Sequence, residues 1–154
     1  EAGTYTLTRE GRDEDDARRG DLDVHEEVVI LGRGMSATII DGNESDRIFH
    51  VFSGASIELR DMTIQNGAAE CGEHGGGIAS SGDVTLADVR VTLNHAGDCM
   101  FWTGDYNGGS GGGVYCESAA LSITDSEIVG NRTGNGAKGL GGAPSQCTKG
   151  SIPT

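Results

Sequence analysis

The sequence predicts an all-β solenoid, in which short strands stack in repeated turns. A phrase of two alternating apolar residues, an Asp, a second apolar pair and a closing Asn occurs at 57–66, 84–94 and 121–131. Three glycines followed by an apolar residue stand between the copies, at 75–78 and 111–114. Self-similarity at this spacing is typical of stacked repeats, and no stretch has the apolar periodicity of an amphipathic helix.

The strands are expected in chain order from the first residues onward. Short apolar or alternating runs predict strands at 4–8, 28–31 and 37–40, and 48–51 begins the regular part. Each later unit has strand, corner, strand, corner, strand and loop, which is the layout of a parallel β-helix with three strands per turn. About five short rungs would stack at ~4.8 Å per rung. We expect one domain over 1–154, comprising an N-terminal strand and acidic loop (1–27), the rungs (28–143) and a non-helical C-terminal tail (144–154).

Equivalent positions of the copies are expected to stack as ladders. Apolar positions would fill the core, and the closing Asn residues would bond to the backbone of the next turn, which is a structural role. The expected sets are Ile57, Val84 and Leu121; Leu59, Leu86 and Ile123; and the amide ladder Asn66, Asn94 and Asn131.

The composition limits the classes of partner. The net charge is −13, with 24 acidic and 11 basic residues, which argues against a nucleic-acid surface and suits divalent cations or a basic partner. No apolar run approaches the ~20 residues of a membrane span. The chain begins with Glu1, as a processed or trimmed product would.

Four cysteines allow three pairings. Cys71 and Cys99 each lie five residues after an Asn of the expected ladder, which favours a disulfide between neighbouring turns. Cys116 and Cys147 would then form the second pair, in an oxidising compartment. The alternative is a zinc ion held by Cys71, His74, His95 and Cys99.

The longest insertion is expected to be an interaction surface. It spans 95–110 and contains Phe101, Trp102 and Tyr106, whose apolar area is large for a slim solenoid. Contact with another protein subunit, packing on the solenoid, and a carbohydrate bound on Trp102 are the three interpretations. Asp98, Asp105 and Asn107 could bond the hydroxyl groups of such a sugar.

Other polar groups permit further sites. The acidic residues Asp13, Asp15 and Asp16 could hold structural Ca²⁺, although they lack the spacing of an EF-hand loop. Asn43 and Asn131 lie in glycosylation sequences, and Asn43 is favoured because a ladder amide could not carry a glycan.

The phrases of this chain resemble the right-handed parallel β-helix repeats of bacterial and archaeal surface proteins. The likeness runs from 20 to about 143 and is carried by GDLDV at 20–24, ATIIDGN at 37–43, RIFHV at 47–51, MTIQNG at 62–67 and the two triple-glycine corners. The chain is similar to the CSLREA-type and polymorphic outer-membrane-like secreted proteins. The Cys-Ser-Leu-Arg-Glu-Ala segment itself is absent, and the acidic loop at 13–16 stands near the place expected for that segment. The resemblance implies a right-handed β-helix, secretion and an extracellular or cell-surface location.

The leading functional hypothesis is a non-catalytic structural protein. Copies of the chain would assemble into an extracellular filament or surface layer through the solenoid ends, the tails and the 95–110 loop. The first alternative is an adhesin-like module that binds carbohydrate or another cell. The second alternative is a polysaccharide lyase or hydrolase, for which the candidates Asp61, Asp88 and Asp125 recur in every copy and are therefore better explained as corner residues. No cofactor is expected beyond the possible Ca²⁺.

Overall fold

The computed structural model describes residues 1–9, 11, 15–99, 108–135 and 148–149. Within these residues the regular structure consists of β-strands alone, and all strand pairs are parallel. The strands are β1 (Gly3–Thr6), β2 (Leu22–Val24), β3 (Glu27–Leu31), β4 (Thr38–Asp41), β5 (Phe49–Val51), β6 (Ser56–Gln65), β7 (Ile78–Ser80), β8 (Asp83–Thr92), β9 (Val114–Cys116), β10 (Ala120–Thr124), β11 (Glu127–Val129) and β12 (Thr148–Lys149).

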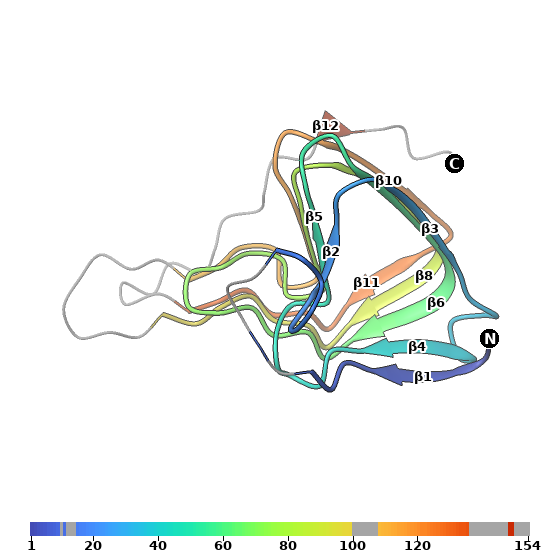
Figure 1. The fold of residues 1–154 in the computed structure, drawn as a ribbon, viewed down its shortest axis with the longest axis horizontal. Helices are drawn as coiled ribbons and strands as arrows, with labels where there is room; N and C mark the ends of the chain where they lie inside the picture. The colour runs from blue at the N-terminus through green and yellow to red at the C-terminus, as the bar shows by residue number, and fades with distance from the viewer. Residues whose placement is uncertain (10, 12–14, 100–107, 136–147, 150–154) are drawn as a thin grey trace.

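The strands form two distinct sheets (Figure 1). The larger sheet has eight strands, in the order β1-β4-β6-β8-β10-β12, with β3 also paired to β6 and β11 also paired to β8. The smaller sheet has four strands, in the order β2-β5-β7-β9. Apolar side chains of both sheets belong to one buried cluster, so the inner faces of the two sheets pack against a shared core.

The prediction of a closed parallel β-helix with three strands per rung is therefore wrong. It placed a corner at the recurring Asp of each copy, and this corner does not separate two sheets. The strands β6 and β8 continue through Asp61 and Asp88 for 10 residues each, and both Asp residues have positive φ, 56° and 54°. A short polar side chain tolerates this left-handed conformation, so the chain bends within one sheet.

Because of this bend, the larger sheet has two segments side by side. The first segment contains β3, residues 56–60 of β6, residues 83–87 of β8, β10 and β12. The second segment contains β1, β4, residues 62–65 of β6, residues 89–92 of β8, and β11. Each segment is thus five strands deep among the described residues.

The expected apolar ladders are present in the strand register. Ile57 pairs with Val84 and Val84 with Leu121. The parallel ladder of Leu59, Leu86 and Ile123 runs beside it. The members on β6 and β8 are at most 1% exposed, whereas those on β10 are half-buried because they lie near the end of the sheet.

Candidate functional site

The outer face of the four-stranded sheet carries a row of polar and aromatic side chains. In register, Asp23 on β2 lies beside His50 on β5, which is followed by Ala79 on β7 and Tyr115 on β9. Neighbouring residues in these strands point into the core, because side chains alternate between the two faces of a strand. The flanking core residues include Val24, Phe49, Val51 and Ile78.

A hollow of about 230 Å³ opens on this face. The small Ala79 lies in the row between His50 and Tyr115, so it leaves room between two rings. The ring of His74 stacks on Tyr115 with the ring centroids 4.3 Å apart, and its Nδ1 accepts a hydrogen bond from the Ser110 N–H. The hollow is lined by Arg47, His50, Glu73, His74, Ala79, Ser80, Ser81, Tyr115 and Glu117.

Arg47 connects this hollow to a buried carboxyl group. Its guanidinium donates from Nε to Asp21, and its Nη2 lies 3.5 Å from Glu73. Asp21 is 4% exposed, and burial raises its pKa to about 7 even though Arg47 acts in the opposite direction. Burial of Asp21 therefore opposes the charged form that Arg47 stabilises.

His50 faces two carboxylates across the β2–β5 pair. Its Nδ1 lies 3.5 Å from Oδ1 of Asp23 and 3.9 Å from Oδ1 of Asp15. Burial lowers the pKa of His50 below its ordinary value of 6.5, and Arg47 acts in the same direction while the two Asp residues oppose it. The neutral imidazole is thus favoured at neutral pH, and neutral imidazole is the form that binds metals.

The loop before β2 brings Asp15 to this place. Gly20 has a φ of 69°, and a Cβ there would lie 2.2 Å from the carbonyl oxygen of Gly11, so only glycine fits. The loop is fastened by hydrogen bonds from the Ala17 N–H to Asp23 and between His25 Nε2 and the Asp15 carbonyl.

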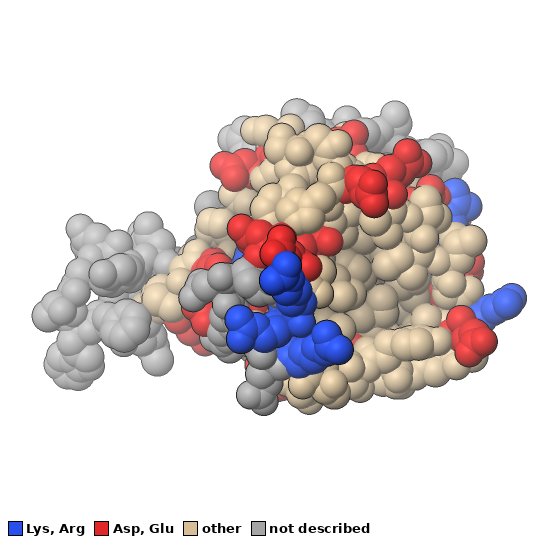
Figure 2. Space-filling model, in the orientation of Figure 1, with Lys and Arg blue, Asp and Glu red and all other residues tan. Residues whose placement is uncertain are grey.

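A second hollow of about 240 Å³ borders this loop and is lined partly by Arg residues. Figure 2 shows basic side chains gathered beside acidic ones on the face that it draws.

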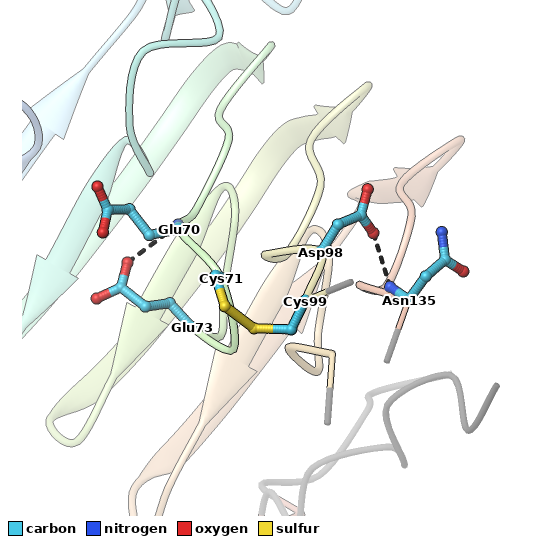
Figure 3. The surroundings of a disulfide bond; sticks show 6 residues. All are labelled: Glu70, Cys71, Glu73, Asp98, Cys99 and Asn135. Atoms are coloured by element: carbon cyan, nitrogen blue, oxygen red, sulfur yellow. Dashed lines mark hydrogen bonds between the residues drawn. A yellow bond between two sulfur atoms is a disulfide. The ribbon is translucent and has the colours of Figure 1, made fainter. Parts of the chain in front are cut away.

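Cys71 and Cys99 form a disulfide, as their equal offsets predict (Figure 3). Both sulfur atoms are engaged in this bond, so the alternative zinc site with His74 and His95 lacks its two thiolates. The corner is further fixed by Asp98, which accepts a hydrogen bond from the Asn135 N–H at 2.7 Å and pairs with Arg132. Cys116 is buried at the end of β9, and Cys147 lies outside the described residues, so their pairing stays a prediction.

Only two of the three expected ladder asparagines stack. Asn131 Oδ1 accepts hydrogen bonds from the backbone N–H and the Nδ2 of Asn94. Asn94 Oδ1 accepts in turn from the N–H of Gly67, at 2.8 Å. Asn66 stands one place earlier in the register and donates instead to Asp41, which corrects the prediction of a three-residue ladder.

The remaining predicted residues are distributed as follows. The loop residues Phe101, Trp102, Asp105, Tyr106 and Asn107 lie outside the described residues, as does Asp13 of the acidic set. Of that set, Asp16 is 3.3 Å from Arg18, whereas Asp15 faces His50. Asn43 is exposed with a φ of 55°, and Asn131 Nδ2 is hydrogen-bonded to the Val91 carbonyl, so Asn43 stays the preferred glycosylation site.

Sequence reasoning missed the pairing of Asp23 with His50. The signal was present, because His50 follows Asp23 at the same spacing at which Val84 follows Ile57. This spacing places residues side by side on neighbouring strands.

Comparisons with known proteins find no matching family model, no matching curated protein and no matching solved structure. The resemblance to surface-protein repeats therefore stays an expectation from the sequence. Among the described residues, no helix has the length and apolar character needed to cross a membrane.

Proposed function

We propose that this chain is a non-catalytic, secreted structural protein whose copies stack end to end into an extracellular filament or surface layer. The observation that carries this proposal is the shape of the two ends of the eight-stranded sheet. At one end, the second segment extends one strand further than the first, to β1. At the other end, the first segment extends one strand further, to β12.

These stepped ends are complementary. Each segment is five strands deep among the described residues, so a copy displaced by five strand spacings would set its β1 on β11 and its β3 on β12 of the copy before it. All pairs within the sheet are parallel, so the new pairs would be parallel as well. The four-stranded sheet has one strand fewer, so its strands would not become continuous across the junction.

The core ladder of the second segment supports the same arrangement. It runs through Tyr5, Ile40, Ile64, Val91 and Ile128 in strand register. The three central members are at most 7% exposed, whereas Tyr5 is 47% and Ile128 is 40% exposed. Stacking would place Ile128 of one copy on Tyr5 of the next and remove both apolar side chains from water.

The disulfide supports an extracellular location, because such bonds persist in oxidising compartments. The net charge of −13 opposes self-association through repulsion between copies. Assembly should therefore strengthen as the salt concentration rises, since ions screen charges further apart than about 10 Å at 0.1 M.

The test is sedimentation velocity of the concentrated full chain, with variants at both ends. Tyr5→Lys and Ile128→Lys each place a charge in the junction and are expected to hold the protein as a monomer. Leu93→Lys is the matched control, because Leu93 is 59% exposed and follows β8, which lies inside the sheet and away from both ends. A wild-type chain that stays monomeric at high concentration and high salt refutes the proposal.

The second candidate is a carbohydrate-binding module, favoured by the hollow beside Tyr115. An aromatic ring next to the charged Arg47 and Glu73 suits a sugar, which offers an apolar face and hydroxyl groups. Glycan binding by the wild type that is lost in Tyr115→Ala would support this function. Binding lost in Trp102→Ala alone would place the site on the 95–110 loop instead.

A further inference from the structure

Three side chains with metal-binding atoms converge above the outer face of the four-stranded sheet. A carboxylate oxygen of Asp15, a carboxylate oxygen of Asp23 and a ring nitrogen of His50 lie within 4.8 Å of one another. Asp23 and His50 are direct neighbours in the β2–β5 pair, and Asp15 comes from the loop that precedes β2. The set therefore joins a rigid sheet to a loop.

The spacing of these atoms fits one ion. Zinc binds nitrogen and oxygen ligands at about 2.0–2.2 Å, so two ligand atoms in a tetrahedral site lie about 3.3 Å apart. His50 Nδ1 is 3.5 Å from Asp23 and 3.9 Å from Asp15. These distances are too long for hydrogen bonds and need only a small contraction of the loop to surround a metal.

The environment of the set indicates more than a chance cluster of acids. The Nδ1 atom of His50 is buried and has no hydrogen-bond partner in the described part of the chain. The side chain of Asp23 is fully buried, and its Oδ2 accepts the Ala17 N–H at 2.7 Å, which fixes the direction of the carboxylate. Hydrogen bonds of this kind orient the ligands of metal sites.

We propose that Asp15, Asp23 and His50 bind a divalent transition-metal ion, for which Zn²⁺ is the best match. An imidazole nitrogen with two carboxylates suits Zn²⁺, whereas Ca²⁺ takes six to eight oxygen ligands. Water would complete the coordination. The ion would tether the loop of residues 15–21 to β2 and β5, and this role does not depend on end-to-end stacking.

The experiment is calorimetric titration of the oxidised, untagged full chain with Zn²⁺ alone. Wild type should bind one ion through this site, and Asp15→Asn and His50→Gln should each weaken that binding by at least about tenfold. Asp16→Asn and His74→Gln are the matched controls, since each changes a nearby residue of the same type outside the set, and neither should weaken binding more than about twofold. Asp15 is 70% exposed, so its variant is expected to fold.

A second readout is independent of affinity. Zn²⁺ should slow tryptic cleavage after Arg18 and Arg19, because the ion fastens the loop that carries them, and it should not do so in Asp15→Asn. Absence of Zn²⁺ binding at millimolar concentration overturns the proposal. So does binding that is equal in wild type, Asp15→Asn and His50→Gln, or Ca²⁺ binding at the same site with higher affinity than Zn²⁺.

Discussion

Asn94 is the polar residue on which the interior of the corner depends most. It is 1% exposed, and its amide accepts from the Gly67 N–H and donates to the Ile64 carbonyl and to Asn131. An amide in this position satisfies backbone groups that have no access to water. Substitution would leave them buried and unbonded, at a cost of about 1–3 kcal/mol for each group.

We therefore predict that Asn94→Ala lowers the free energy of unfolding by about 2 to 4 kcal/mol. The exposed Asn43→Ala should change it by less than about 0.5 kcal/mol. Urea denaturation followed by circular dichroism measures both. Equal stability of the two variants would show that the Asn94 amide does not stabilise the buried corner.

Asp41, at the end of β4, gives stability a dependence on pH. Burial opposes ionisation of this carboxyl, but hydrogen bonds from Gln65, the Asn43 N–H and Asn66 outweigh it, so the pKa falls below its ordinary value of 3.8. A lowered native pKa means that the unfolded chain binds the proton more readily. The contribution is present above the unfolded value and is lost as the pH falls through the native pKa.

The expected result is a difference between wild type and Asp41→Asn that exists at pH 7 and shrinks below about pH 3.8. The measurement is urea denaturation of both proteins at pH 7 and near pH 3. A difference that is the same at both pH values, or larger in acid, contradicts the assignment. Asp16→Asn controls for the change in net charge, because Asp16 is exposed.

At the scale of the elements, the disulfide joins the corner after β6 to the corner after β8. It closes a loop with a sequence separation of 28 residues, and closing such a loop in the unfolded chain stabilises the fold by about 3 to 4 kcal/mol in the chain-entropy account. We expect the double variant Cys71→Ser/Cys99→Ser to lose about this much stability, measured by urea denaturation.

The same double variant also examines the second predicted pair. If Cys116 and Cys147 are bonded, a reducing agent will destabilise the double variant further. If they are not bonded, reduction will leave its unfolding midpoint unchanged. A wild-type protein whose stability does not respond to reduction would contradict the structural role of Cys71 and Cys99.

Local sequence patterns predicted the strand register well and the sheet boundaries poorly. The ladder of Ile57, Val84 and Leu121 follows from alternation and repeat spacing, which are properties of the sequence itself. The sequence pattern predicts a corner between sheets at Asp61, whereas the structure bends there within one sheet. Whether a residue in the left-handed conformation ends a strand depends on the strands that pair with the chain on either side of it. Here β3 pairs with the part of β6 before Asp61, and β4 pairs with the part after it.

The candidate site was harder to predict, because it lies outside the repeated phrases. Asp15 was recognised as a possible cation ligand, but its partners Asp23 and His50 are brought to it by strand pairing and by the path of the loop. Asn66 illustrates the same limit. The first copy of the phrase is one residue shorter than the other two, so Asn94 lies opposite Gly67 and the ladder loses one member.

At the scale of the whole molecule, the two ends of the larger sheet, where its outermost strands lie, differ from its outer face. The outer face presents side chains, and the backbone groups beneath them are already paired. The ends present strand edges and the half-exposed ladder residues Tyr5 and Ile128. Edges of this kind readily pair with another chain unless they are blocked. In the proposed filament, the five-strand depth of both segments would give a subunit rise of about 24 Å.

Electron microscopy of the concentrated protein, at low and at high salt, tests the central claim most directly. The proposed stacking predicts filaments at high salt with an axial repeat of about 24 Å, present in Leu93→Lys and absent in Tyr5→Lys and Ile128→Lys. Isolated particles of the wild type in both conditions, or filaments that persist in both end variants, would contradict it.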